Sequence, residues 1–261
     1  MTRGSLHVHS TYCDGKSTLE EMILSAIEKK FTYLGFSGHG YTDFDERYCM
    51  SKENEAKYFE EIGILAEKYK DKIKILRGVE RDGLSNYDAH PYDYKIASVH
   101  YINVDGTIYE IDGGKEIQEK AIKDSFGGDA YAFAEKYFET VAGQTGDIVG
   151  HFDLITKYDK VDKIFNPSEE RYKKAAISAM EILLDKNMVF EVNTGSMARG
   201  YKDRPYPAMW ILEELKKRGG KVIITSDCHR AEALDFAYDE TEKMLSKIGF
   251  KDFYNIDFIK K

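Results

Sequence analysis

Residues 189–229 read VFEVNTGSMARGYKDRPYPAMWILEELKKRGGKVIITSDCH. Two short apolar runs, Val189–Asn193 and Val222–Asp227, flank a segment with the apolar spacing of a helix, Pro207–Arg218. A strand, a helix and a second strand in this order are typical of a βαβ unit in a parallel sheet. The second strand leads into Asp227-Cys-His229, where a carboxylate and an imidazole stand two positions apart.

The same alternation extends over the whole chain. The candidate strands are Gly4–His9, Tyr33–Ser37, Ile73–Glu80, Tyr94–His100, Asp147–His151, Val189–Asn193 and Val222–Asp227. The candidate helices are Thr18–Lys30, Glu53–Lys70, Ala130–Ala142, Glu169–Lys186, Pro207–Arg218 and Glu232–Lys247. Seven such repeats predict an α/β fold, a closed or nearly closed seven-stranded (β/α)7 barrel like a TIM barrel. No linker-like tract interrupts the pattern, so residues 1–261 are expected to form one domain.

Composition limits the class of protein. The formal net charge is -8, which argues against broad binding to a nucleic-acid backbone. The mean hydropathy is -0.52 and no run of about 18 apolar residues is present, so no membrane association is expected. The three cysteines are scattered, without a CxxC pair, and the N-terminus does not resemble a secretory signal. These features predict a cytoplasmic protein, and they leave its oligomeric state open.

Six of the seven histidines stand at or just after the carboxyl end of a candidate strand. They are His7, His9, His39, His100, His151 and His229, and Glu80 and Asp227 share this placement. In a parallel barrel all these strand ends meet at one rim, so the side chains converge on a rigid frame. Residues two apart in a strand point to the same face, so His7 and His9 can bind one ion together. The remaining histidine, His90, lies within a loop and is not a predicted ligand.

This ligand chemistry predicts a metal-dependent hydrolase. Imidazoles and carboxylates without thiolates suit Zn, Mn or Fe(II). Cys228 lies between two candidate ligands and is interpreted as a packing residue. Asp112-Gly-Gly-Lys and Gly127-Gly128 lack the strand–loop–helix context of a P-loop and are interpreted as turns.

From His7 to His229 the chain resembles the PHP (polymerase and histidinol phosphatase) family, whose fold is a distorted seven-stranded barrel. The resemblance implies a first metal ion held by His7, His9, Glu80 and Asp227, and a second held by Glu80, His100 and His151. A third ion would use Asp14, His39 and His229, although Asp14 in Asp-Gly is also an ordinary turn signal. Two or three divalent ions are therefore expected.

Within the family the chain is most similar to the histidinol-phosphate phosphatases. The run from Glu191 through Arg199 to Arg204-Pro-Tyr-Pro is similar to the segment that supplies their basic phosphate contact, which Arg199 matches. Arg204 and Arg230 are further candidate substrate contacts. The loop from His39 to Met50 has acidic residues around Arg47, and no role is assigned to it.

The expected reaction is attack of hydroxide on the phosphorus of a small phosphate monoester, L-histidinol phosphate, in histidine biosynthesis. Arg199 would neutralise developing charge, and Asp227 and His229 complete the predicted catalytic set. His229 or Asp153 would act as general acid, although Asp153 is better interpreted as a residue that orients a ligand imidazole. Two alternatives remain open: a PHP-type phosphoesterase acting on nucleotides or phosphotyrosine, and a non-catalytic docking module.

Overall fold

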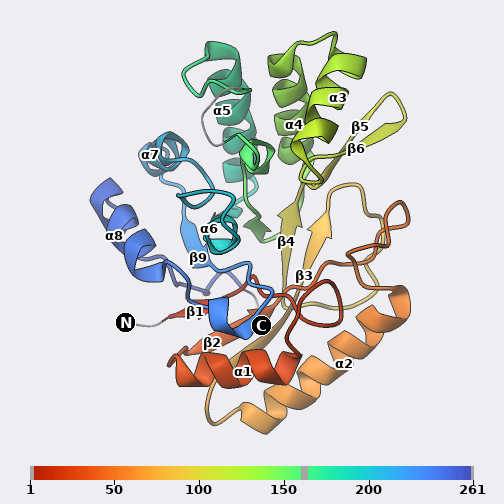
Figure 1. Cartoon of the computed structure of the whole chain (residues 1–261). Coiled ribbons are helices and arrows are strands. Elements are labelled where there is room, and N and C mark those ends of the chain that lie inside the picture. Colours follow the sequence, from red (N-terminus) through yellow and green to blue (C-terminus); the bar gives the residue numbers. More distant parts are fainter. Residues whose placement is uncertain (1–2, 160–163, 260–261) are drawn as a thin grey trace.

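The computed structural model describes residues 3–159 and 164–259. Seven parallel strands form one sheet in the order β1-β2-β3-β4-β7-β8-β9. They are β1 Gly4–Ser5, β2 Tyr33–Phe36, β3 Lys74–Asp82, β4 Tyr94–Ser98, β7 Ile148–Val149, β8 Val189–Asn193 and β9 Val222–Thr225. Beyond β1 and β9, Val8 and Cys228 form a further parallel bridge, in which the amide of His9 donates to the carbonyl of Cys228 at 3.0 Å. The two edge strands thus meet, and the sheet forms a nearly closed barrel (Figure 1).

Helices surround the strands in Figure 1. They are α1 Leu19–Glu28, α2 Lys52–Tyr69, α3 Lys115–Phe126, α4 Ala130–Gly143, α5 Glu170–Asp185, α6 Gly195–Ala198, α7 Met209–Lys217 and α8 Tyr238–Ile248, with short 3-10 turns at η1 Leu154–Thr156 and η2 Ala231–Ala233. Thr18 begins α1 with a capping box, in which its hydroxyl accepts from the Glu21 amide while the Glu21 carboxylate accepts from the Thr18 amide. Asp14 lies in the loop that precedes this cap.

Apolar side chains from the strands fill the inside of the barrel. They are Leu6, Tyr33, Leu76, Tyr94, Ile96, Ile148, Val189 and Ile223. Burial of each such side chain contributes roughly 1.5–3 kcal/mol. The Tyr94 hydroxyl donates to the carbonyl of Leu6 at 2.5 Å or of Phe36 at 3.1 Å. Gly78 leaves room for the Tyr94 ring, since a Cβ there would lie 2.2 Å from a ring carbon.

The structure differs from the sequence prediction in several segments, among them β7, which is shorter than the predicted strand Asp147–His151, and α6, which was not predicted. The turn-rich region after Tyr101 contains an antiparallel hairpin, β5 Tyr101–Val104 and β6 Thr107–Glu110, followed by α3. Its outer strand is half exposed and lacks an apolar alternation, and the Asp105-Gly106 turn adopts positive φ angles. The last helix begins at Tyr238 rather than Glu232, because residues 231–233 form a 3-10 turn. The first strand is shorter than predicted and continues as the isolated bridge at Val8.

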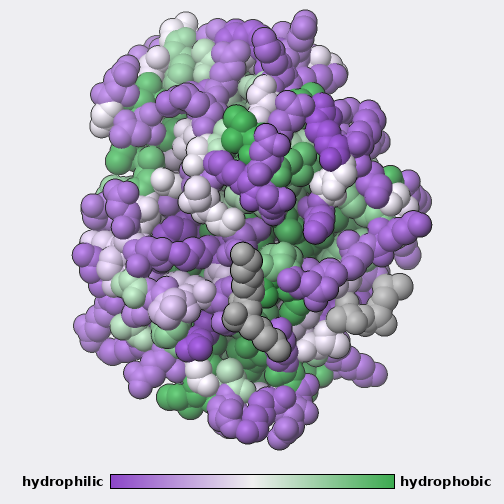
Figure 2. All heavy atoms as spheres, turned by 180° about the vertical axis from the view of Figure 1, so that it is seen from behind, coloured by the Kyte–Doolittle hydropathy of each residue, from purple (hydrophilic) through white to green (hydrophobic). Residues whose placement is uncertain are grey.

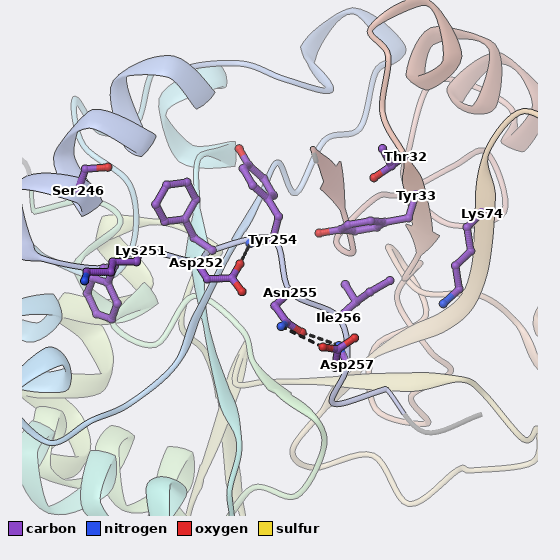
Figure 3. A pocket seen from close by; sticks show the side chains of 12 residues that line it. Thr32, Tyr33, Lys74, Ser246, Lys251, Asp252, Tyr254, Asn255, Ile256 and Asp257 are labelled. Atoms are coloured by element: carbon purple, nitrogen blue, oxygen red, sulfur yellow. Dashed lines mark hydrogen bonds between the residues drawn. The ribbon is translucent and has the colours of Figure 1, made fainter. Parts of the chain in front are cut away.

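The C-terminal segment covers the amino-terminal mouth of the barrel. Ile256, Phe258 and Ile259 pack against the inner core, and a cavity of about 780 Å³ lies between this segment and the starts of β2 and β3. The Tyr33 hydroxyl points into that cavity (Figure 3). None of the predicted metal ligands lines it, so the candidate site lies at the opposite end of the strands.

The face of the molecule opposite to that in Figure 1 is largely polar. Figure 2 shows hydrophilic side chains over most of the face seen there, with apolar patches between them. Within residues 3–159 and 164–259, no helix combines the length and the hydrophobicity that a bilayer crossing requires.

Candidate metal centre

All nine predicted metal ligands lie together at the carboxyl-terminal rim of the barrel. His7 and His9 follow β1, His39 follows β2, Glu80 lies in β3, and His100 and His151 follow β4 and β7. Asp227 and His229 follow β9, and Asp14 comes from the loop before α1. Eight of these side chains come from the ends of six strands, as the parallel arrangement predicts.

Glu80 lies at the centre of the cluster and is 1% exposed. Its Oε2 is 2.9 Å from His39 Nδ1 and 3.1 Å from His7 Nε2. Its Oε1 is 3.0 Å from His151 Nε2 and 3.5 Å from His100 Nε2, and it accepts a hydrogen bond of 2.6 Å from Ser98. The two carboxylate oxygens therefore face two different groups of imidazoles, as a bridging ligand would.

The donor atoms fit a bound cation. His7 Nε2, His9 Nε2 and Glu80 Oε2 are buried and have no hydrogen-bond partner among the described residues. Leaving such an atom unpaired costs about 1–3 kcal/mol. These atoms lie within 4.8 Å of one another, and Glu80 Oε2 is 3.1 and 3.6 Å from the two imidazole nitrogens. Ligand atoms about 2.1 Å from a tetrahedral zinc ion lie about 3.4 Å apart, so the spacing matches a divalent metal site.

Two further groups of donors share residues with the first. One comprises His9, Asp14, His39 and His229, and the other His39, Glu80 and His100. His229 Nε2 lies 3.1 Å from Asp14 Oδ2, and His39 Nε2 lies 3.8 Å from Asp14 Oδ1. The ring of His39 thus presents one nitrogen to Glu80 and the other to Asp14, and His9 belongs to two groups. The family resemblance assigns His9 to the first ion alone and His39 to the third alone, whereas here each of them belongs to two groups.

The electrostatics of the cluster favour charged carboxylates. Burial opposes the charge of Glu80, but the imidazoles of His7, His39 and His100 hold its pKa well below the usual range. Burial, reinforced by His229 and His39, lowers the pKa of His9 to about 3. His9 is therefore neutral near pH 7, as a ligand must be.

Sequence reasoning missed the carboxylates that support the ligands. Glu191 is fully buried, lies 2.5 Å from His7 Nδ1, and accepts from the His151 amide at 2.7 Å and from Thr225 Oγ1 at 2.6 Å. Asp82 accepts from the His100 amide at 2.8 Å. A charged residue inside the apolar run of β8 was the available signal for Glu191, since an unpaired buried charge is costly.

Arg199 ends α6 and lies against Asp227. Its guanidinium donates to the Asp227 carbonyl and to Asp227 Oδ2, both at 2.9 Å, and one of its nitrogens lies 3.2 Å from His229 Nδ1. Asp227 adopts a left-handed backbone conformation with φ 45°. A Cβ at Gly195 would lie 2.9 Å from the Asp227 carboxylate, so glycine there allows the close approach.

A cavity of about 190 Å³ opens over the cluster. It is lined by eight of the predicted site residues, Asp14, His39, Glu80, His100, His151, Arg199, Asp227 and His229. Lys157, which was not predicted, also lines it and forms an ion pair of 2.9 Å with Asp112.

The other candidate contacts lie elsewhere. Arg204 lines a separate cavity with Gly200, Lys202 and Asp203, and Arg230 is exposed at the start of η2. Asp153 accepts from the Ala208 amide at 3.0 Å, while His151 Nδ1 has no partner among the described residues. The interpretation of Asp153 as the residue that orients a ligand imidazole is therefore wrong for His151. Cys228 is buried in the core, as predicted.

Comparisons with known proteins give matches over most of the chain. Residues 5–195 match the PHP domain. The histidinol-phosphatase of Bacillus subtilis (strain 168) is 24% identical over 261 residues, which cover 89% of this chain and 96% of that protein. The histidinol-phosphatase of Lactococcus lactis subsp. lactis (strain IL1403) is 26% identical, covering 97% and 93%. A crystal structure of histidinol phosphate phosphatase from Lactococcus lactis, complexed with Zn, L-histidinol and phosphate, has a similar fold, with a TM-score of 0.74 at 21% identity over 99% of this chain and 98% of that one.

Proposed function

The chain belongs to the PHP domain family, and from this premise we propose that it is a metal-dependent phosphomonoesterase that hydrolyses L-histidinol phosphate to L-histidinol and phosphate. Two histidinol-phosphatases align with it along nearly their whole length, which supports this substrate over others in the family. The reaction would place the protein in histidine biosynthesis.

One observation carries the proposal. Donor atoms of His7, His9 and Glu80 that are buried and have no partner among the described residues converge, and the guanidinium of Arg199 lines the cavity that Glu80 also lines. Donors without a partner suit a cation, and a guanidinium suits the planar edge of a phosphate group. A binding site for both is what hydrolysis of a phosphate monoester requires.

Two or three divalent ions, of Zn, Mn or Fe(II), would be held by the nine ligands described above. When bound, such ions supply positive charge that binds phosphate oxygens and makes an attacking water more acidic. The three overlapping donor groups are compatible with either number.

The chain's own residues would bind the phosphate and move the proton. Arg199 is held by Asp227 and can donate to a phosphate oxygen, and Lys157 adds a second cation at the cavity. The leaving oxygen needs a proton. Of the two candidate acids, His229 lines the cavity and Asp153 does not, but His229 could donate a proton only in a state in which it holds no metal ion.

The alternatives have less support. The net charge of -8 disfavours a polynucleotide substrate, which requires a basic groove. A non-catalytic docking module does not require a complete set of metal ligands. Here every expected ligand lies at the rim, which favours an enzyme.

Chelation and reconstitution test the proposal. Phosphate release from L-histidinol phosphate should stop after metal stripping and return on addition of Zn, Mn or Fe(II). His9→Gln should lose at least about a hundredfold in kcat, because a metal ligand is removed. His90→Gln is the matched control, since His90 stacks on Phe59 outside the cluster. Activity that survives complete stripping would contradict the proposal.

A further inference from the structure

The cavity at the amino-terminal mouth of the barrel has walls from segments that are far apart in the sequence. The starts of β2 and β3 form one wall, and the end of α8 with the segment that follows it forms the other. In Figure 3, Thr32, Tyr33 and Lys74 of the strand wall face the side chains of the C-terminal segment. The volume of about 780 Å³ lies in the range of small-molecule binding sites.

The C-terminal wall is fixed by contacts outside the cavity. The Ile224 amide in β9 donates to the Phe253 carbonyl at 3.0 Å, and the Tyr254 hydroxyl donates to Glu242 Oε1 at 2.8 Å. Ile256 packs against the inner core of the barrel. The cavity is therefore formed without a ligand, as is usual for sites that bind small molecules.

The Tyr33 hydroxyl is a polar group in this cavity that lacks a partner. Tyr33 is 2% exposed, and its hydroxyl oxygen is buried without a hydrogen-bond partner among the described residues. The hydroxyl points from the strand wall towards the C-terminal segment (Figure 3). Burial raises the pKa of Tyr33, and the negative charge of Asp252 raises it further, so the hydroxyl stays protonated and can both donate and accept. A polar group of a bound molecule would remove the cost of the missing partner.

The charged side chains of the cavity are not neutralised by one another. They are Lys74, Lys251, Asp252 and Asp257. Within residues 3–159 and 164–259 none of the four forms an ion pair. Two ammonium groups and two carboxylates thus line one cavity without mutual contact. A ligand that has one positive and one negative group would bring an opposite charge to each kind, whereas a ligand of a single charge would leave one kind unpaired.

Aromatic side chains supply the apolar surface of the cavity. Phe250, Phe253 and Tyr254 line it, and each of the three residues is less than 8% exposed. Buried rings of this kind have a fixed orientation and pack well against another ring in an offset or edge-on arrangement. The cavity therefore combines a surface for a ring with contacts for two opposite charges.

We propose that this cavity is a binding site for a free aromatic amino acid, separate from the metal centre. The ligand's ammonium group donates to Asp252 and to the Tyr33 oxygen, its carboxylate accepts from Lys74, and its ring packs against Phe253 and Tyr254. The inference does not depend on the substrate of the metal centre, because no metal ligand lines this cavity.

The test is a titration of the reconstituted protein with L-phenylalanine as the probe, followed by saturation-transfer NMR. Binding should saturate, and the ring protons should receive the strongest transfer. Phenethylamine lacks the carboxylate and 3-phenylpropanoate lacks the ammonium group, so each should bind about two- to fivefold more weakly, since one contact to an exposed charge is lost. N-Acetyl-L-phenylalanine amide lacks both charges and should bind about tenfold more weakly.

Variants place the ligand in the cavity. Tyr33→Phe should weaken L-phenylalanine binding about three- to tenfold, because one hydrogen bond is lost. It should leave the Tm of the unliganded protein unchanged or raise it, since the hydroxyl removed has no partner. Lys74→Gln should weaken binding about two- to fivefold. Lys72→Gln is its matched control, because Lys72 is exposed two positions away and does not line the cavity.

His9→Gln separates this site from the metal centre. It perturbs a metal ligand and should leave the affinity for L-phenylalanine within about twofold of wild type. Binding that is lost in His9→Gln and kept in Tyr33→Phe would place the amino acid at the rim and overturn the inference. The absence of saturable binding, or equal affinities for L-phenylalanine and phenethylamine, would also overturn it. None of these results bears on phosphate release from L-histidinol phosphate, which tests the proposed function separately.

Discussion

At the scale of single residues, Arg199 is the proposed phosphate contact. Its planar guanidinium contacts Asp227 at two points and lines the cavity over the metal ligands. Arg199→Lys keeps the charge but loses this geometry, so kcat/KM for L-histidinol phosphate should fall about 100-fold. Arg230→Lys should change it less than about twofold, since Arg230 is exposed and does not line the cavity. Steady-state kinetics with matched metal content measures kcat/KM for both variants. Equal losses would contradict the assignment of Arg199, rather than Arg230, as the phosphate contact.

Glu191 supports the cluster from behind His7. Its carboxylate holds His7 Nδ1, which leaves His7 Nε2 free to face the other donors. Glu191→Gln should weaken metal binding about 10- to 100-fold, because the negative charge that makes the imidazole a better ligand is removed. Competition with a coloured chelator measures this loss. Glu181→Gln, at an exposed acid on α5, is the control, and equal affinities in the two variants would remove Glu191 from this role.

The sequence predicts most of the side chains that the structure brings together at the rim, but few of their partners. The strand-end histidines and Glu80 could be predicted as site residues because parallel strands bring their carboxyl ends to one rim. The contact between Glu191 and His7 joins residues 184 positions apart, and that of Arg47 with Glu110 depends on a hairpin that the sequence pattern did not reveal. Such pairs form through tertiary packing, so the local hydrophobic pattern of the sequence does not predict them.

At the scale of elements, the close packing of Tyr94 inside the barrel gives a test. Gly78→Ala places a methyl group into the Tyr94 ring and should reduce the free energy of unfolding by about 1–3 kcal/mol. Gly143→Ala is the control, because nothing lies within 4 Å of a Cβ at this helix position, and it should be neutral or slightly stabilising. Urea denaturation compares the two. A Gly78→Ala variant as stable as wild type would contradict the packing described here.

The predicted strands and helices match the observed ones where the pattern is strong. Val189–Asn193 is correct to the residue because it is an uninterrupted buried run. The hairpin and α3 were missed because β6 is largely exposed and α3 buries few side chains. The start of α8 was placed too early because residues 231–237 contain a 3-10 turn and a positive φ at Ala237.

At the scale of the molecule, the metal ions should stabilise the fold. The ligands come from six strands and the loop before α1, so bound ions would link elements that are distant in sequence. At about 100 times the dissociation constant a ligand contributes about 2.7 kcal/mol, so stripping should lower Tm by roughly 5–10 °C. Calorimetry of the stripped and reconstituted protein measures this shift, and a single transition is expected if residues 1–261 form one domain, as predicted. An unchanged Tm would contradict ions held by this set of ligands.

The most direct test of the central claim is a comparison of kcat/KM values for the reconstituted enzyme. L-Histidinol phosphate would be assayed beside nucleoside monophosphates, phosphotyrosine and a 3′,5′-bisphosphate, with and without chelator. We expect a preference for L-histidinol phosphate of at least about a hundredfold, which corresponds to roughly 2.7 kcal/mol of transition-state binding, and its loss on chelation. A preference for nucleotides or phosphotyrosine, or no hydrolysis of any ester with the metals restored, would contradict the account.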